Sequence, residues 1–468
     1  MSSSTSSIAG VKNPGFVKGA NGKPEVFRSR TGSEIHYSRD GRVHEVHARN
    51  MTIVHNSFGT RRVFVERVDH SRVVVYRSGF GYVQRPFYYH GSEFAGRTYY
   101  WNGRPYALYY QRYPYRGLYL FGYSPYRYYR PAFYGWAYNP WGVPVRYTWG
   151  WYGNPWYGYY GYYYQPYSIY PSASFWLTDY LLSLSLQQAY LAQANQTAAY
   201  AAPVGGEVVL TPEVKDAIAA EVQNQLAVEN AESQTVGRGG NLDINSSGLP
   251  RILAEASPSH PRIFVVAGPL EVTDSSGQEW SLTEGDVLRL TTPPPSDSTS
   301  AYLQVFASKN GECPRGTTVS VGLADLQEMQ NHMRASIDQG LQDLQAHQGG
   351  LPAPPAAAAA PPVQSPFAPI APPADPSVSS QLQQQARAAD TAEQGVLDEA
   401  KQVDSSAAGD VDTTASSSPT QINVGQTISE VIGLMGNPRR VVNLGAKKIY
   451  VYSDMKITFV NGRVTDVQ

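Results

Sequence analysis

The segment from Tyr99 to Tyr170 constrains the fold more than any other part of the sequence, because 24 of its 72 residues are tyrosine. No aspartate or glutamate occurs between Phe94 and Thr178, whereas seven arginines do. Rings in this number either pack on one another or form surface patches of the kind that mark binding sites. The whole chain of 468 residues also holds 42 glycines and 34 prolines, which favours small folded units on spacers.

A 15-residue repeat lies inside this tyrosine-rich segment. Residues 134–142 (YGWAYNPWG) return as residues 149–157 (WGWYGNPWY), and in each copy an Asn-Pro pair indicates a turn between two tryptophans. Such rings stack on sugars or on nucleic-acid bases, and arginines attract anions, so the repeat is a candidate binding platform. The alternative is a core in which the rings pack on one another. The candidate binding residues are Trp136, Trp141, Trp151, Trp156, Arg130 and Arg146.

The charges divide the chain into two unlike halves. Residues 1–178 carry 21 Lys and Arg against 7 Asp and Glu, and residues 179–468 carry 16 against 31. A basic half of this kind is typical of a surface that meets an anionic polymer, or that attracts the acidic half of the same chain. The alternative is that both halves are ordinary solvated surfaces.

Local patterns predict the elements on either side of the tyrosine-rich segment. Alternating runs between residues 31 and 98, with Asp40-Gly41 at a turn, predict a β-meander. Apolar periodicity predicts a helix over about 174–198, and Thr211-Pro212 indicates the start of a second helix.

Five short strands in residues 261–321 predict a small β-barrel. Residues 280–288 (WSLTEGDVL) resemble the strand-turn-strand of bacterial Src-homology-type barrels. The next stretch, Leu323–Leu344, has leucine, isoleucine and methionine at spacings of three and four, which predicts an amphipathic helix. This helix either covers the barrel or serves self-association.

The C-terminal residues carry the most specific pattern. Gly425 to Val431 (GQTISEV), followed by Leu434 to Pro438 (LMGNP), resembles the start of the SmpA/OmlA (BamE-like) lipoprotein domain. Thr427 and Glu430 fit a capping box and Gly436 fits a helix end, which predicts a short helix over about 428–435. Four strands are expected after it, the last two joined by Asn461-Gly462. The resemblance implies a small α+β domain.

The expected fold class is therefore a modular α+β chain. Its parts are a β-meander, an aromatic segment with helices, a small barrel with a helix, a Pro/Ala-rich low-complexity spacer and a C-terminal α+β domain. The predicted boundaries are a disordered N-terminus 1–30, a β-hairpin module 31–98, a Tyr/Trp-rich segment 99–172, a helical region 173–233, a linker 234–260, the barrel 261–321, the helix 322–348, a disordered linker 349–422 and the last domain 423–468.

The sequence contains no motif for catalysis, a cofactor or a metal. His44 and His47 fall on opposite faces of a strand, whereas a metal-binding HExxH pair needs helical spacing. The lone Cys313 has no histidine partner nearby and is interpreted as a loop thiol. A hydrolase within the tyrosine-rich segment is disfavoured, because that segment lacks carboxylates.

We therefore expect a non-enzymatic binding or scaffolding protein of the bacterial envelope, periplasmic or at the outer envelope, whose partner is cell-wall glycan or an outer-membrane component. The alternative is a cytosolic RNA-associated protein that uses arginine and tyrosine stacking. As written the N-terminus has no charged region followed by an apolar one, so the envelope interpretation expects a start upstream of Met1. The apolar stretch 173–186 is too short to span a bilayer.

Overall fold

The structure is a computed structural model that divides into two compact units, Met1–Val403 and Asp404–Gln468. No helix among the residues it describes is long and apolar enough to cross a membrane. The described residues are 14–19, 22–38, 41–56, 61–76, 80–101, 103–194, 210–240, 242–309, 313–346, 351–352, 354, 358, 360–408, 426–428, 431, 435, 440–444, 447–452, 455–460 and 463–467.

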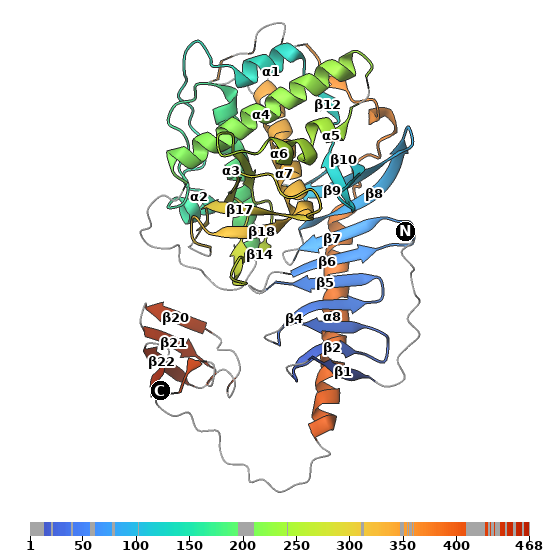
Figure 1. The fold of residues 1–468 in the computed structure, drawn as a ribbon, viewed down its shortest axis with the longest axis vertical. Helices are drawn as coiled ribbons and strands as arrows, with labels where there is room; N and C mark the ends of the chain where they lie inside the picture. The colour runs from blue at the N-terminus through green and yellow to red at the C-terminus, as the bar shows by residue number, and fades with distance from the viewer. Residues whose placement is uncertain are drawn as a thin grey trace. The chain divides into compact units, whose positions relative to one another are not determined.

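An antiparallel sheet of eleven strands begins the first unit, and its strands lie in the order of the chain (Figure 1). Tight turns set this order. At His90-Gly91 both turn residues have positive φ, as a two-residue type I′ hairpin requires. The strands are β1 (Gly15–Lys18), β2 (Pro24–Arg28), β3 (Glu34–Tyr37), β4 (Val43–Ala48), β5 (Met51–His55), β6 (Arg61–Glu66), β7 (Arg72–Tyr76), β8 (Gly81–Tyr89), β9 (Ser92–Trp101), β10 (Arg104–Tyr115) and β11 (Leu118–Tyr123).

The predicted meander is confirmed, but two of its predicted boundaries are wrong. Strands β1 and β2 lie in residues 1–30, which were expected to be disordered. The sheet also continues past residue 98 through β10 and β11, which belong to the tyrosine-rich segment. In β10 and β11 the side chains alternate between the two faces of the sheet, as they do in the earlier strands. The predicted boundary at residue 98 is wrong because it followed the change in composition and not this alternation.

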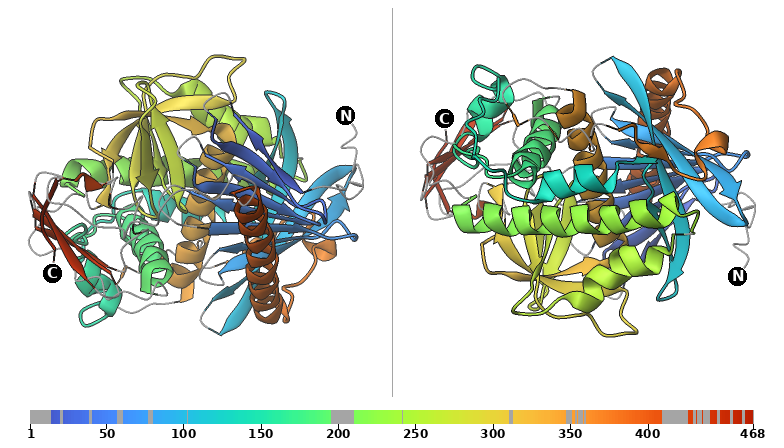
Figure 2. Two further views of the ribbon diagram at one scale, coloured as in Figure 1. Left: turned by 90° about the horizontal axis from the view of Figure 1, so that it is seen from below. Right: turned by 90° about the horizontal axis from the view of Figure 1, so that it is seen from above.

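One face of the sheet is covered by residues 360–403, named here the C-terminal belt. Helix α8 (Val378–Ala408) packs on β2 to β8; Figure 1 shows it running across these strands, and Figure 2 shows it beside the sheet. The preceding residues, with the 3-10 helix η3 (Ala368–Ile370), cross β8 to β10. Gly96 makes room for this crossing, because a Cβ there would lie 2.8 Å from Cγ of Pro372.

The prediction of a disordered linker over 349–422 is therefore wrong for the belt. Its apolar stripe consists of small side chains that form a stable helix only against a partner surface, which the sequence pattern did not reveal. Residues 409–422 lie outside the described residues. The buried belt residues of this helix are Val378, Leu382, Ala389, Val396 and Ala400.

The tyrosine-rich segment after β11 forms an aromatic core with four helices. Both helices predicted downstream of it are confirmed, and Thr211 caps the second with its side-chain oxygen, which accepts a hydrogen bond from the backbone N–H of Val214 at 3.5 Å. Tyr160, Tyr163 and Tyr164 are fully buried. The helices are α1 (Pro131–Tyr138), α2 (Pro155–Tyr160), α3 (Ala173–Ala194) and α4 (Pro212–Gly237).

Asp179, the first acidic residue after the long acid-free stretch, lies in the middle of this core. Its carboxylate is 3.1 Å from Nζ of Lys215. It also accepts hydrogen bonds of 2.6 Å from the hydroxyl of Tyr170 and from the backbone N–H of Tyr167. Burial raises the pKa of Asp179 and lowers that of Lys215. This buried pair joins α3 and α4 to the tyrosine-rich segment.

The predicted barrel is an open sheet of six strands, because the terminal strands β13 and β15 do not pair with each other in the described structure. Glu221 of α4 bonds instead to Arg262 and to the backbone of Ile263 on β13. The order is β13-β16-β17-β18-β14-β15. The strands are β13 (Arg262–Val265), β14 (Leu270–Asp274), β15 (Glu279–Leu282), β16 (Val287–Leu290), β17 (Ser300–Ala307) and β18 (Thr318–Gly322).

Helices lie on both sides of the six-stranded sheet in the sequence, at residues 244–255 and 323–346. The linker predicted over 234–260 contains α5 (Ile244–Ser247) and α6 (Leu249–Glu255), and Ile244 and the leucines of α6 pack into the core of the six-stranded sheet. The predicted helix α7 (Leu323–Ala346) is confirmed, but its apolar stripe is buried inside the chain and gives no support to self-association. A short pair, β12 (Arg127–Tyr128) with β19 (Val363–Gln364), ties the belt to the tyrosine-rich segment.

The second unit contains the four predicted antiparallel strands, with Val431, Ile457 and Phe459 fully buried. Ile428, Val431 and Met435 are helical, as expected. Glu430, Gly436 and the Asn461-Gly462 turn lie outside the described residues. The strands are β20 (Arg440–Leu444), β21 (Lys447–Val451), β22 (Lys456–Val460) and β23 (Arg463–Val467). The expected α+β class is confirmed for the chain.

Candidate functional site

A cavity of about 1000 Å³ lies in the first unit between the large sheet and α7. We call it the sheet-helix cavity. Its walls come from β6 to β11, from α7, from the end of α3 and from the turn between β13 and β14. The volume is at the upper end of the range for small-molecule sites.

Strand alternation selects which side chains line this cavity. Val63, Val73 and Val83 point to the face covered by the belt and are buried there. Their neighbours, including Arg62 and Tyr82, point the other way and line the cavity. The sheet thus has an apolar belt face and a polar, aromatic cavity face.

Aromatic rings form much of the cavity face. The rings of Tyr99 and Tyr106 stack, with centroids 5.4 Å apart and planes at 19°. Phe80 and Trp101 form a second pair at 6.2 Å. Tyr106 keeps 38% of its surface exposed, so part of this aromatic area is open to a ligand.

Arg97 is the buried centre of the cavity face, with 3% exposure. Its guanidinium contacts Glu328 of α7 through two hydrogen bonds, of 2.8 and 3.0 Å, and donates a third to Gln84. It also lies over the rings of Tyr82 at 4.7 Å and Tyr110 at 4.1 Å. Arg97 therefore links the sheet to α7, and the carboxylate of Glu328 balances its positive charge.

The other cavity arginines are compensated in similar ways. Arg61 pairs with Asp390 and with Glu393, whose carboxylate lies 3.0 Å from it, and Arg72 pairs with Glu66. Burial raises the pKa of Asp338, whereas the hydrogen bond from the Tyr123 hydroxyl and the charge of Arg127 oppose that rise. The remaining arginine, Arg62, lies within electrostatic reach of Glu284 and Asp325.

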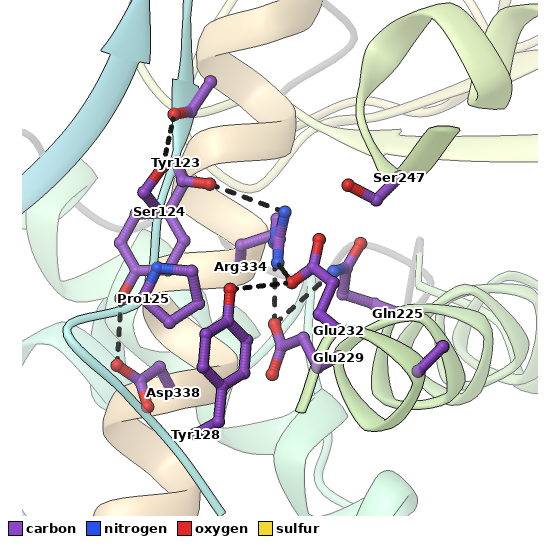
Figure 3. Close-up of polar contacts among 12 residues, drawn as sticks. Tyr123, Ser124, Pro125, Tyr128, Gln225, Glu229, Glu232, Ser247, Arg334 and Asp338 are labelled. Carbon is purple, nitrogen blue, oxygen red and sulfur yellow. Dashed lines mark hydrogen bonds and ion pairs between the residues drawn. The ribbon is translucent and has the colours of Figure 1, made fainter. Parts of the chain in front are cut away.

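A buried ionic network adjoins the cavity near Asp338 (Figure 3). Arg334 of α7 contacts Glu232 at 2.6 Å and Glu229 at 3.6 Å, both on α4. The hydroxyl of Tyr128 donates to Glu232 at 3.1 Å. Burial raises the pKa of Glu229 to about 8 despite the nearby arginine. The network fixes α4 against α7, the helix that forms the cavity wall.

A serine and a histidine lie close together at the edge of the cavity. Oγ of Ser185 is 3.0 Å from Nε2 of His332, and burial lowers the pKa of this histidine to about 4. The serine hydroxyl also lies 3.0 Å from the backbone oxygen of Leu181, a second acceptor for its proton. The pair joins α3 to α7.

The predicted platform residues do not form a common surface. Trp141 and Trp156 are buried at 8% and 7% exposure, and Trp136 stacks on Trp141. Trp151 stacks on Trp149 at 4.2 Å and meets Trp156 edge-on. These rings belong to the aromatic core, as in the alternative interpretation of the repeat.

The two copies of the repeat also have different backbone roles. Asn139 ends α1, whereas Asn154 precedes α2 as its N-cap residue. Arg130 and Arg146 are exposed, and Arg130 donates to the backbone oxygen of Pro361 at 3.2 Å. Similar sequences therefore fold differently here, because their surroundings differ.

The single cysteine is buried in the structure. Cys313 is buried at 1% exposure, and burial raises the pKa of its thiol to about 11, which keeps it unreactive. Within the described residues, no cluster of three or more His, Cys, Asp or Glu side chains is arranged to hold a metal ion.

Sequence reasoning missed the sheet-helix cavity. Most of its residues come from two regions far apart in the chain, about 61–127 and 267–342, and Leu184, Gln188 and Ala374 complete the lining. The alternation of Arg97, Tyr99 and Trp101 along one strand was a usable signal, since it predicts a polar, aromatic sheet face. No protein-family model, curated protein or solved structure matches the chain. The geometry of the cavity is therefore what bears on the function of the chain.

Proposed function

We propose that the chain is a non-enzymatic binding protein that holds a segment of glycan in the sheet-helix cavity. The observation that carries this proposal is the pairing of open aromatic ring faces with many polar side chains in one large cavity. Sugar rings present apolar faces and hydroxyl edges, so they need stacking surfaces and hydrogen-bonding groups together.

The charges of the cavity favour a glycan over a nucleic acid. A site for phosphates presents unpaired cationic groups, whereas Arg61, Arg72 and Arg97 are already paired with carboxylates. Glu284 and Asp325, which line the same cavity and have no ion-pair partner among the described residues, would repel a polyanion. The RNA-associated alternative therefore has no support in this site.

The envelope location belongs to the same proposal. The four-stranded sheet of the second unit accords with the α+β domain that the resemblance of residues 425–438 implies. In this proposal the second unit serves attachment or scaffolding, and the first unit binds the glycan.

Calorimetric titration with oligosaccharides of four to six sugar units tests the proposal. Trp101→Ala and Tyr106→Ala remove cavity rings that are partly exposed, so the fold should persist. Each substitution should weaken binding by roughly tenfold or more, since stacking on one ring contributes about 1–3 kcal/mol. Tyr302→Ala, at a 64% exposed ring on β17 that does not line the cavity, is the matched control.

Two outcomes would contradict the proposal. If single-stranded RNA binds with steep salt dependence and the oligosaccharides do not bind, the cavity has been assigned to the wrong ligand class. If reducing ends appear during incubation with the oligosaccharides, the protein is a hydrolase.

A further inference from the structure

The cavity face of the large sheet continues past the sheet-helix cavity on four neighbouring strands, β8 to β11. Side chains that are an even number of residues apart on a strand share a face. Gln84, Arg97 and Tyr110 line the cavity, so the residues at even spacing from them face the same way. Tyr119 lines the end of the cavity itself. The group named here the outer patch consists of Tyr88 on β8, Glu93 on β9, Arg112 on β10 and Tyr119 on β11.

Strand pairing and side-chain contacts join the outer patch into one row. Tyr88 pairs with Glu93 across β8 and β9. The Glu93 carboxylate accepts a hydrogen bond of 2.7 Å from the guanidinium of Arg112. That guanidinium also lies over the ring of Tyr119, 3.8 Å from its centroid. The row crosses four strands, which at about 4.8 Å between neighbouring strands is about 14 Å.

The two rings of the outer patch are exposed, unlike most of the aromatic side chains near them. Tyr88 is 65% and Tyr119 is 62% exposed, whereas Tyr110 and Tyr123 at the cavity are buried. Exposed rings grouped beside a cavity are typical of a binding surface. The ion pair between Arg112 and Glu93 compensates both charges, so the patch suits an uncharged polar ligand better than a polyanion.

The cavity reaches solvent at two separate places on these strands. Tyr106 pairs with Tyr99 near one end of β10, and Tyr119 pairs with Pro114 near the other. Tyr106 and Tyr119 both line the cavity, and both are exposed. Positions 106 and 114 of β10 are about 26 Å apart at about 3.3 Å per residue. A ligand that extends from Tyr106 to Tyr119 can therefore continue into solvent at each end, as the interior of a polymer does.

We propose that the outer patch extends the glycan site, so that the preferred ligand is an internal stretch of a long uncharged glycan. The inference rests on the proposed glycan-binding function and specifies its ligand class. The glycan leaves the cavity at Tyr119 and crosses the patch to Tyr88. The two tyrosines supply ring faces for sugars, and Arg112 and Glu93 supply a donor and an acceptor for hydroxyl groups.

The test compares the tetramer and the octamer of β-1,4-linked N-acetylglucosamine, because only the octamer can occupy the cavity and reach Tyr88 together. In calorimetric titration of the full-length protein, the octamer should bind at least roughly tenfold more tightly, since stacking on one further ring has an effect of this size. Tyr88→Ala should weaken octamer binding roughly tenfold and leave tetramer binding unchanged. Tyr302→Ala is the matched control, because its ring is 64% exposed and lies outside the cavity and the patch. It should bind both oligomers as the parent does.

Thermal unfolding of Tyr88→Ala and Tyr302→Ala shows that each variant is folded before its binding is compared. If Tyr88→Ala binds the octamer as tightly as the parent, the patch is not part of the site, and tetramer binding by the parent leaves the glycan-binding function standing. Binding of neither oligomer by the parent would overturn both proposals. If sedimentation shows a dimer that Tyr88→Ala dissociates, the patch binds a second copy of the chain and its assignment to glycan is wrong.

Discussion

At the scale of single residues, buried charges determine which side chains the fold cannot lose. Asp179→Asn keeps an acceptor for Tyr170 and Tyr167 but leaves Lys215 without its counter-ion in a buried position. We expect a loss of about 3–5 kcal/mol in the free energy of unfolding, measured by urea denaturation. Adding Lys215→Met should recover part of it. A cost no larger than that of Asp297→Asn, at an exposed residue, would contradict this account.

Glu229 gives the stability of the first unit a dependence on pH. Its pKa is about 8 in the folded chain, against an ordinary value of 4.5. Between these values the folded chain retains a proton that the unfolded chain has lost, so the free energy of unfolding should fall as pH rises across this window. Glu229→Gln should flatten the dependence, as urea titrations at pH 5 and pH 8 would measure. If the free energy of unfolding of the variant still falls with pH as steeply as that of the parent, groups other than Glu229 cause the dependence.

At the scale of elements, the belt helix depends on one stripe of apolar side chains, most of them alanine and valine. Leu382→Ala removes a buried side chain of α8 and should destabilise the packing of this helix by about 2–5 kcal/mol. The measurement is limited proteolysis, in which cleavage within residues 378–403 should become faster. Gln383→Ala, on the exposed side of α8, should leave the cleavage pattern unchanged. Equal cleavage of both variants would mean that the stripe does not hold α8.

Elements defined by local signals could be predicted, and those defined by distant partners could not. The C-terminal strands, the start of α4 and the extent of α7 follow from turn residues, a cap and a periodic stripe that lie within each segment. The belt was interpreted as disordered because alanine and valine at helical spacing become a core only beside the sheet. The cavity depends on strands and a helix that are some 200 residues apart.

At the scale of the whole molecule, the division into two units predicts two separate unfolding transitions. Phe459 is fully buried in the second unit, with its ring 4.8 Å from that of Tyr450. Phe459→Ala should cost about 3–5 kcal/mol and shift one calorimetric transition only. Phe133→Ala, fully buried in the first unit, should shift the other. A single transition that both variants shift would show that the two units unfold together.

The position of the belt in the chain has a consequence for synthesis on the ribosome. The apolar sheet residues from Phe27 to Val83 emerge first, and the belt residues that cover them, Val378 to Ala400, emerge about 300 residues later. At about 5–20 residues per second this interval lasts on the order of 15–60 s. Throughout it the nascent chain presents an uncovered apolar sheet face, the kind of surface that chaperones bind.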